Sequence, residues 1–109
     1  MSEEKPSIIE LATKCSQLRK DGHPDEVIIL TGDIIGNLDR YKVTDGIDRI
    51  YCTRGAAFRQ LGDDAEALRC ALKSLEINSD FKYAFNLAGA AAIGLGKSEG
   101  AEDYFNEAR

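Results

Sequence analysis

Histidine, proline and tryptophan are scarce in this chain, which has one histidine, two prolines and no tryptophan in 109 residues. Metal sites and catalytic triads built on histidine need that residue beside further polar groups. His23 stands alone next to Pro24, which favours a role at a helix start. We therefore predict no catalytic residue, no metal site and no cofactor, and the chain is not expected to be an enzyme.

Two short segments resemble pieces of enzyme motifs but are incomplete. Gly32-Asp33 is similar to the Gly-Asp pair of metal-dependent phosphoesterases, yet the histidine ligands of a two-metal site are missing. Gly96-Lys97-Ser98 matches the end of a phosphate-binding loop, but Ala91 stands where the motif needs its first glycine. Neither segment predicts a nucleotide or metal site.

The chain also lacks long apolar runs, paired cysteines and an excess of basic residues. Its longest purely aliphatic run, residues 27–30, is far below the roughly 18 residues that a membrane span needs. The polar residues 1–6 show no secretory signal and predict a flexible tail. Cys15, Cys52 and Cys70 have no C-x-x-C spacing and are expected to be reduced, buried thiols. The net charge of −5 argues against nucleic acid, and a cytoplasmic protein without membrane contact is predicted.

Helical periodicity accounts for most of the chain. Ile8, Leu11, Cys15 and Leu18 recur at spacings of three and four, which forms one helical stripe. Similar stripes and turn signals predict six helices, over about residues 8–20, 24–38, 47–61, 64–77, 81–95 and 98–109. The fold class is therefore all-α, with one long connection near residues 39–48.

The second of these helices has an alternative as a buried strand. Residues 27–31, Val-Ile-Ile-Leu-Thr, are rich in β-branched side chains. Pro24 followed by Asp25 and Glu26 is typical of a helix start, and no second convincing strand is available for pairing. The helix is the favoured interpretation.

An internal repeat appears when the chain is shifted by 34 residues. Identical pairs are Gly55 and Gly89, Ala57 and Ala91, Leu61 and Leu95, Gly62 and Gly96, and Ala67 and Ala101. Gly62 and Gly96 fall in the turns between paired helices. Gly55 and Gly89 fall within helices, where a missing side chain allows close approach of a second helix.

Tyr51-x2-Arg54-Gly55-x2-Phe58, followed by Gly62 and Ala67, resembles the tetratricopeptide repeat. A second unit begins at Phe85, and a looser first unit is separated by six extra residues. Departures from the family pattern include Arg54 in place of leucine, Ala92 and Ala71 in place of aromatics, and Ser79 in place of proline. The resemblance implies one domain over 7–109, with repeats at about 7–40, 47–80 and 81–109. It implies six helices in antiparallel helix–turn–helix pairs, stacked as a right-handed superhelix.

In that family the first helix of each pair lines a concave groove that binds peptides. The resemblance and the helical period together give these groove candidates: Arg19, Lys20, Arg49, Arg59, Tyr83 and Asn86. The basic members suit an acidic or C-terminal peptide, since guanidinium groups bind carboxylates with two hydrogen bonds. Alternatively, these are solvated charges paired with acids such as Asp45, Asp48 or Asp63. Ala12, Ser16 and Thr53 do not match the clamp that captures chaperone tails.

Helical-repeat arrays usually finish with a polar capping helix, which is missing before Arg109. Tyr104, Phe105 and Ala108 are therefore expected to expose an apolar surface. Such a surface indicates a fragment of a larger protein or a homo-oligomer. Three functions stay open: a scaffold for a protein or peptide partner, an oligomerisation module, and an N-terminal accessory domain of an enzyme such as a transferase.

Overall fold

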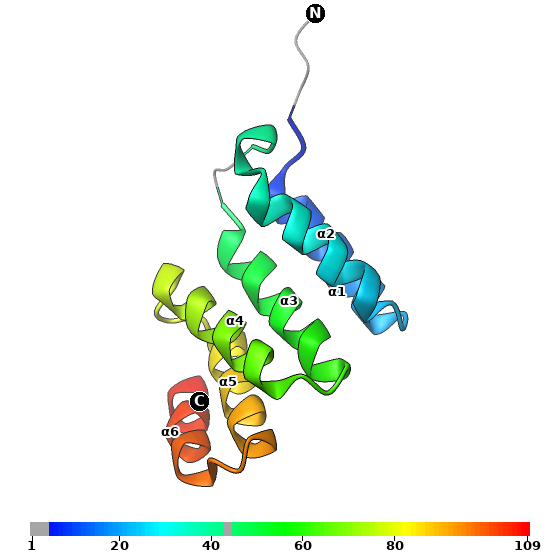
Figure 1. Ribbon diagram of the computed structural model, residues 1–109. Helices are drawn as coiled ribbons and strands as arrows, with labels where there is room; N and C mark the ends of the chain where they lie inside the picture. Colours follow the sequence, from blue (N-terminus) through cyan, green and yellow to red (C-terminus); the bar gives the residue numbers. More distant parts are fainter. Residues whose placement is uncertain (1–4, 43–44) are drawn as a thin grey trace, which may run out of the picture.

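The computed structural model describes residues 5–42 and 45–109, so the tail predicted for residues 1–6 lies largely outside it (Figure 1). The α-helices are α1 (Ile8–Lys20), α2 (Pro24–Gly36), α3 (Ile47–Gln60), α4 (Asp64–Ile77), α5 (Lys82–Gly94) and α6 (Ser98–Ala108). A short 3₁₀ helix, η1 (Leu38–Arg40), follows α2. The all-α prediction is confirmed, and residues 27–31 are helical rather than a strand.

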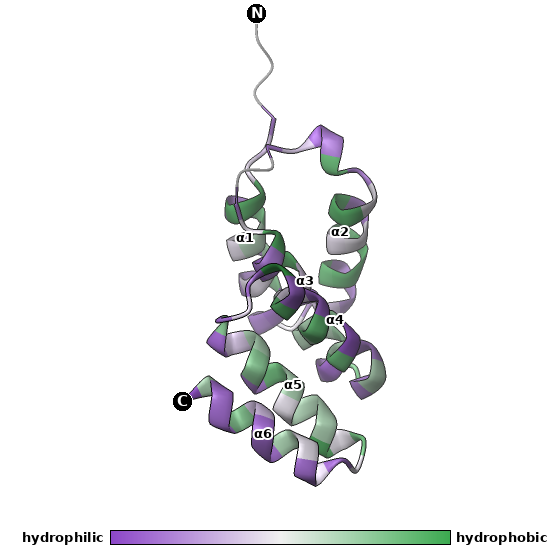
Figure 2. Cartoon of the chain, turned by 90° about the vertical axis from the view of Figure 1, so that its left-hand side faces the viewer, coloured by the Kyte–Doolittle hydropathy of each residue, from purple (hydrophilic) through white to green (hydrophobic). Residues whose placement is uncertain are grey.

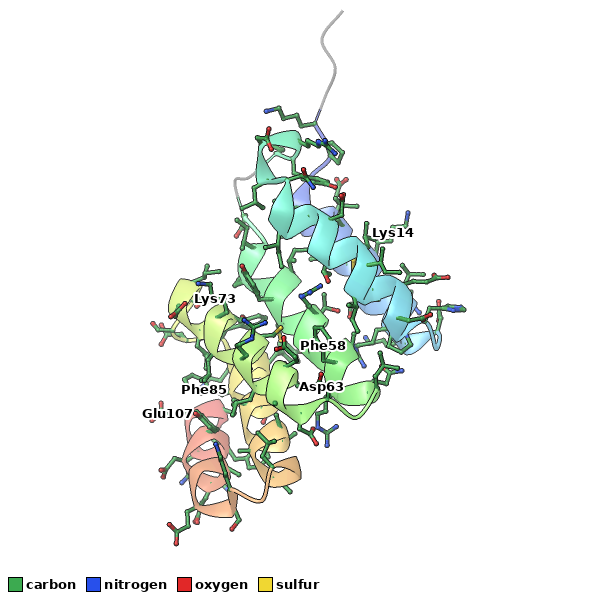
Figure 3. All side chains as sticks on the ribbon, viewed as in Figure 1. Lys14, Phe58, Asp63, Lys73, Phe85 and Glu107 are labelled. Atoms are coloured by element: carbon green, nitrogen blue, oxygen red, sulfur yellow. The ribbon has the colours of Figure 1, made fainter. Side chains whose placement is uncertain are left out.

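Local sequence signals explain where the helices begin and end. Pro24 occupies the first turn of α2, and the Asp63 carboxylate accepts a 3.1 Å hydrogen bond from the Glu66 amide at the start of α4. Figure 3 labels Asp63 where the chain enters α4. The turn glycines Gly22, Gly62 and Gly96 have φ angles of 92°, 88° and 78°, a left-handed conformation that glycine adopts without strain. The predicted turn positions are therefore confirmed.

The helices form three antiparallel pairs that stack along the molecule. Each of α2 and α4 packs on the first helix of the following pair, and α3 contacts both α1 and α5. In Figure 2 the α1–α2 pair lies above α3 and α4, and the α5–α6 pair lies below them. The resulting body measures 55 × 27 × 21 Å, which is the elongated shape expected of stacked repeats.

Small residues bring α3, α4, α5 and α6 close together. A Cβ added at Gly55 would lie 2.8 Å from Leu87 Cδ2 and 2.9 Å from Cys70 Cβ, so α4 and α5 both close on α3 at this point. At Gly89 the ring of Phe105 occupies the corresponding space. The predicted close approach at both glycines is confirmed. The buried residues of this cluster are Ala67, Ala71, Leu87, Ala88 and Ala91.

A second apolar cluster joins α1, α2 and α3. Its buried members are Ile8, Ala12, Ile34 and Ile50. Leu38 and Tyr41, which follow α2, pack against the same cluster. None of the helices in the described part of the chain combines the length and the apolar character needed to cross a membrane.

The connection after α2 folds back on the helices instead of forming an open loop. The sequence predicts a helix as far as residue 38, but α2 ends at Gly36, and the Asn37 side-chain amide donates 2.9 Å to the Asp33 carbonyl. Tyr41 Oη donates 2.9 Å to Asp33 Oδ2, and the Lys42 amide donates 2.8 Å to the Pro6 carbonyl. These bonds attach Tyr41 to α2 and Lys42 to the segment before α1.

Candidate functional site

The groove candidates lie on the first helices of the three pairs, α1, α3 and α5. Lys20 and Arg59 lie near the C-terminal ends of α1 and α3, whereas Arg49 and Tyr83 lie near the N-terminal ends of α3 and α5. Arg49 and Arg59 are ten residues apart, which corresponds to about 15 Å along a helix. The arrangement therefore suits an extended partner segment better than a single carboxylate group.

Arg19 differs from the other basic candidates because it connects α1 to α3. Its Nη1 donates 3.4 Å to Gln60 Oε1, and Gln60 Nε2 donates 3.2 Å back to the Arg19 carbonyl. The Arg19 side chain is half-buried, and its buried Nε has no hydrogen-bond partner within the described residues. This guanidinium links the two helices, and its buried Nε–H is left without a partner by that contact.

Lys20, Arg49 and Arg59 are exposed. Arg59 Nε lies 4.0 Å from Asp64 Oδ1, a loose and solvent-screened pair, so the acid beside it is Asp64 and not Asp63. In the parts of the chain that the structure describes, no carboxylate lies within 4.0 Å of the side chains of Lys20 or Arg49. Most of the basic charge on these helices is therefore open to solvent.

The middle of the face that carries the groove candidates is partly closed by packing between helices. Ala12 is buried between α1 and α3, and Cys52 and Ala56 are half-buried against the cluster around Leu87. Tyr83 and Asn86 remain exposed on α5, with 73% of Tyr83 accessible and its ring edge-on to Phe81 at 5.9 Å. The accessible part of this face is its two ends and the surface of α5.

The expected apolar surface at the end of the chain is smaller than predicted. Tyr104, Phe105 and Ala108 are half-buried. Phe105 packs over Gly89 and Tyr104 packs against the cluster around Leu87, because α5 is thin enough to receive both rings. The prediction that these three residues are exposed was wrong. Assembly of the protein through them stays a prediction.

The three cysteines are free thiols surrounded by helices. Cys15 and Cys70 are buried and Cys52 is half-buried. Burial raises the pKa of Cys52 to about 12, although the positive charge of Arg19 opposes that rise. Burial likewise raises the pKa values of Cys15 and Cys70. All three thiols are protonated at neutral pH, a state in which thiols are poor nucleophiles.

The sequence interpretation missed a hollow on another side of the molecule. It lies between α2, α3 and α4 and encloses about 570 Å³. Its lining residues are Gly32, Ile35, Gly36, Tyr51, Arg54, Arg69, Cys70, Leu72, Lys73 and Glu76. The one signal for it in the sequence is Arg54, a cation at a position where the repeat pattern has leucine.

Comparison with known proteins identifies the middle pair of helices. Residues 48–81 match the model of the family described as Tetratricopeptide repeat, and this segment covers nearly all of α3 and the whole of α4. No curated protein and no solved structure matches the chain.

Proposed function

We propose that the chain is a protein-interaction scaffold of the tetratricopeptide-repeat type, which residues 48–81 match, and that it holds an acidic partner segment along α1, α3 and α5. The family match at residues 48–81 and the stacked helix pairs support a protein-binding scaffold. The acidic character of the partner and the face that it occupies are the finer parts of this proposal.

The open basic side chains on these first helices carry the proposal. Lys20, Arg49 and Arg59 are exposed in a protein of net charge −5, where an acidic surface would be expected to repel an acidic segment. Guanidinium groups form two parallel hydrogen bonds with a carboxylate. An extended acidic segment could therefore pair with Arg59 near one end of α3 and with Arg49 near the other.

Exposed groups on α5 favour a peptide over a free anion. Tyr83 offers a large ring with a polar tip, and the Asn86 side chain carries both a donor and an acceptor. Such groups contact the backbone and side chains of a bound segment. The half-buried Arg19 contributes at the C-terminal end of α1 through guanidinium N–H groups on Nη1 and Nη2 that do not bond to Gln60.

Charge reversal tests this proposal. The Arg49→Glu/Arg59→Glu variant keeps the helices, since both side chains are exposed, but should lose the partner that the wild-type chain captures from a lysate of its own cells. Lys14→Glu/Lys97→Glu makes the same change in net charge at two other exposed positions, and Figure 3 shows Lys14 projecting away from α3. Capture should survive in this control. Equal capture by both variants, or equal loss, would contradict the proposal.

A further inference from the structure

Arg54 reaches from α3 across to α2. Its Nη1 donates 2.6 Å to the carbonyl of Ile28 and 3.0 Å to Thr31 Oγ1. Its guanidinium carbon lies 5.1 Å from the centre of the Phe58 ring, a distance at which a cation and an aromatic face attract. The guanidinium is thus held in place by contacts from α2 and α3 at the hollow between α2, α3 and α4, which we term the α2–α4 groove.

The charges in the α2–α4 groove do not balance. Arg69 Nη2 pairs with Glu66 at 2.7 Å and Lys73 with Glu76 at 3.3 Å, so each of these cations has its own acid. Among the described residues, no carboxylate lies within 4.0 Å of Arg54. After the two ion pairs are counted, Arg54 leaves the groove with a net positive charge.

Two glycines of α2 shape the wall opposite Arg54. A Cβ added at Gly32 would lie 3.2 Å from Arg54 Nη1, so this glycine leaves room for the guanidinium. Among residues 5–42 and 45–109, a Cβ added at Gly36 would meet nothing within 4 Å, so packing in this part of the chain does not explain the glycine. Gly36 lines the groove one helical turn along α2 from Gly32, and its missing side chain widens the groove there.

Apolar side chains complete the groove beside this charge. Ile35 of α2, Tyr51 of α3 and Leu72 of α4 contribute to the lining, and Leu72 is exposed. The groove is therefore a half-buried cation surrounded by aliphatic and aromatic surface, shared among three helices. A small inorganic anion would use the cation but not this apolar surface, whereas a peptide would use both.

We propose that the α2–α4 groove is a second binding site, which takes a peptide segment carrying an Asp or Glu next to an aliphatic side chain. The carboxylate pairs with the N–H groups of Arg54 that do not bond to α2. The aliphatic neighbour rests on Ile35, Tyr51 and Leu72. Arg54 shares α3 with Arg49 and Arg59, but it bonds to α2, and most of the groove lining comes from α2 and α4. The site therefore adds to the proposed scaffold function and does not depend on it.

The probe is a random dodecapeptide library displayed on phage and selected against the full chain. Selected sequences are then synthesised with their acid and with the matching amide, Asp→Asn or Glu→Gln. Binding to the wild-type chain and to Arg54→Leu is measured by fluorescence anisotropy. Leucine is the residue that the repeat pattern has at this position, so Arg54→Leu keeps the fold while it removes the charge. Lys14→Leu removes one positive charge from the outer side of α1 and is the matched control.

The proposal predicts at least one class of selected peptides with an acid beside an aliphatic residue. Their affinity should fall about tenfold or more in Arg54→Leu and in the amide peptide, because each change removes one partner of a charge-assisted hydrogen bond. It should stay unchanged in Lys14→Leu and in Arg49→Glu/Arg59→Glu. In a two-dimensional NMR titration the amide signals of Gly32 and Gly36 should shift, and those of Gly89 and Gly96 should not.

Two results would overturn this site. One is a selection whose peptides all bind Arg54→Leu as well as they bind the wild-type chain. The other is sensitivity to Arg54→Leu that is the same for the acid and the amide peptide. Peptides that lose affinity only in Arg49→Glu/Arg59→Glu would support the first-helix site and reject the α2–α4 groove, so the two proposals fail separately.

Discussion

Arg54 Nη1 lies 2.6 Å from the carbonyl oxygen of Ile28, so a side chain of α3 is bonded to the backbone of α2. The tetratricopeptide pattern has leucine at this position, where it would supply apolar packing. In this chain the contact is polar, and it includes the buried Thr31 hydroxyl at 3.0 Å. Arginine in place of leucine leaves a charged group at the junction of α2, α3 and α4.

The first prediction separates packing from charge at Arg54. Arg54→Leu should change the free energy of unfolding by less than about 1 kcal/mol, because Thr31 Oγ1 still donates to the Val27 carbonyl and leucine refills the space. Arg54→Ala should destabilise by about 1–3 kcal/mol, since it also removes the aliphatic stem of the side chain. Urea unfolding followed by circular dichroism measures both. Equal destabilisation by the two variants would show that the hydrogen bonds, and not the packing, matter here.

Gly55 is predicted to tolerate no added carbon. A methyl group there would lie 2.8 Å from Leu87 Cδ2 and 3.0 Å from the Ala67 carbonyl oxygen, so the three helices would have to separate. Gly55→Ala should therefore cost about 1–3 kcal/mol despite the better helix propensity of alanine. Gly100→Ala is the matched control, because in the part of the chain that the structure describes no atom lies within 4 Å of a Cβ at that position. A Gly55→Ala variant as stable as Gly100→Ala would contradict this packing.

Gly46 and Gly62, two of the glycines with positive φ, are predicted to differ in how far they tolerate a side chain. Both have φ angles that other residues avoid, 102° and 88°, so either change to alanine costs roughly 1 kcal/mol of backbone strain. At Gly46 the new Cβ would also lie 2.9 Å from the Ile9 backbone, whereas at Gly62 it would meet no atom of the described residues within 4 Å. Gly46→Ala should lower the melting temperature more than Gly62→Ala. A lower melting temperature for Gly62→Ala than for Gly46→Ala would contradict the contact between Gly46, at the start of α3, and Ile9 of α1.

The free energy of unfolding is predicted to depend on pH through the Cys52 thiol. Its folded-state pKa of about 12 lies above the ordinary value of 9.0, so the unfolded chain loses the thiol proton first. The contribution of the protonated Cys52 thiol to the stability of the fold is complete below pH 9 and is lost as the pH rises toward 12. The slope of this loss is at most about 1.4 kcal/mol per pH unit for one proton. Urea unfolding at pH 8, 9, 10 and 11 measures it.

The matched control for this titration is Cys52→Ala. Tyrosine and lysine titrate in both chains, so the difference between the two free energies of unfolding isolates the thiol. That difference should shrink as the pH rises above 9. A difference that stays constant with pH would mean that water reaches the Cys52 thiolate in the folded state.

Much of the fold could be predicted from the sequence because its signals are local. Pro24, Gly22, Gly62 and Gly96 mark helix ends, and the period of 34 residues pairs the helices. The predicted bounds of the last four helices agree with the structure to within one residue at each end. The predicted end of α2 was wrong, because the Asn37 side chain ends the helix by bonding to Asp33, and periodicity carries no signal for that bond.

The functional surfaces were harder to predict because they depend on neighbouring helices. A helical period places Ala12 and Arg19 on one stripe, but only the distance between α1 and α3 buries the first and ties the second to Gln60. The rings of Tyr104 and Phe105 were expected to be exposed, whereas the small residues of α5 receive them. The groove beside Arg54 depends on the spacing of three helices and could not be located from residue order.

In the proposed function, exposed basic side chains on the first helices hold an acidic partner segment. The most direct measurement compares capture of the partner by the wild-type chain, by Arg49→Glu/Arg59→Glu and by Lys14→Glu/Lys97→Glu, with helix content checked by circular dichroism. We expect Arg49→Glu/Arg59→Glu alone to lose capture, and both variants to keep the helix content of the wild-type chain. Retained capture by Arg49→Glu/Arg59→Glu would contradict it.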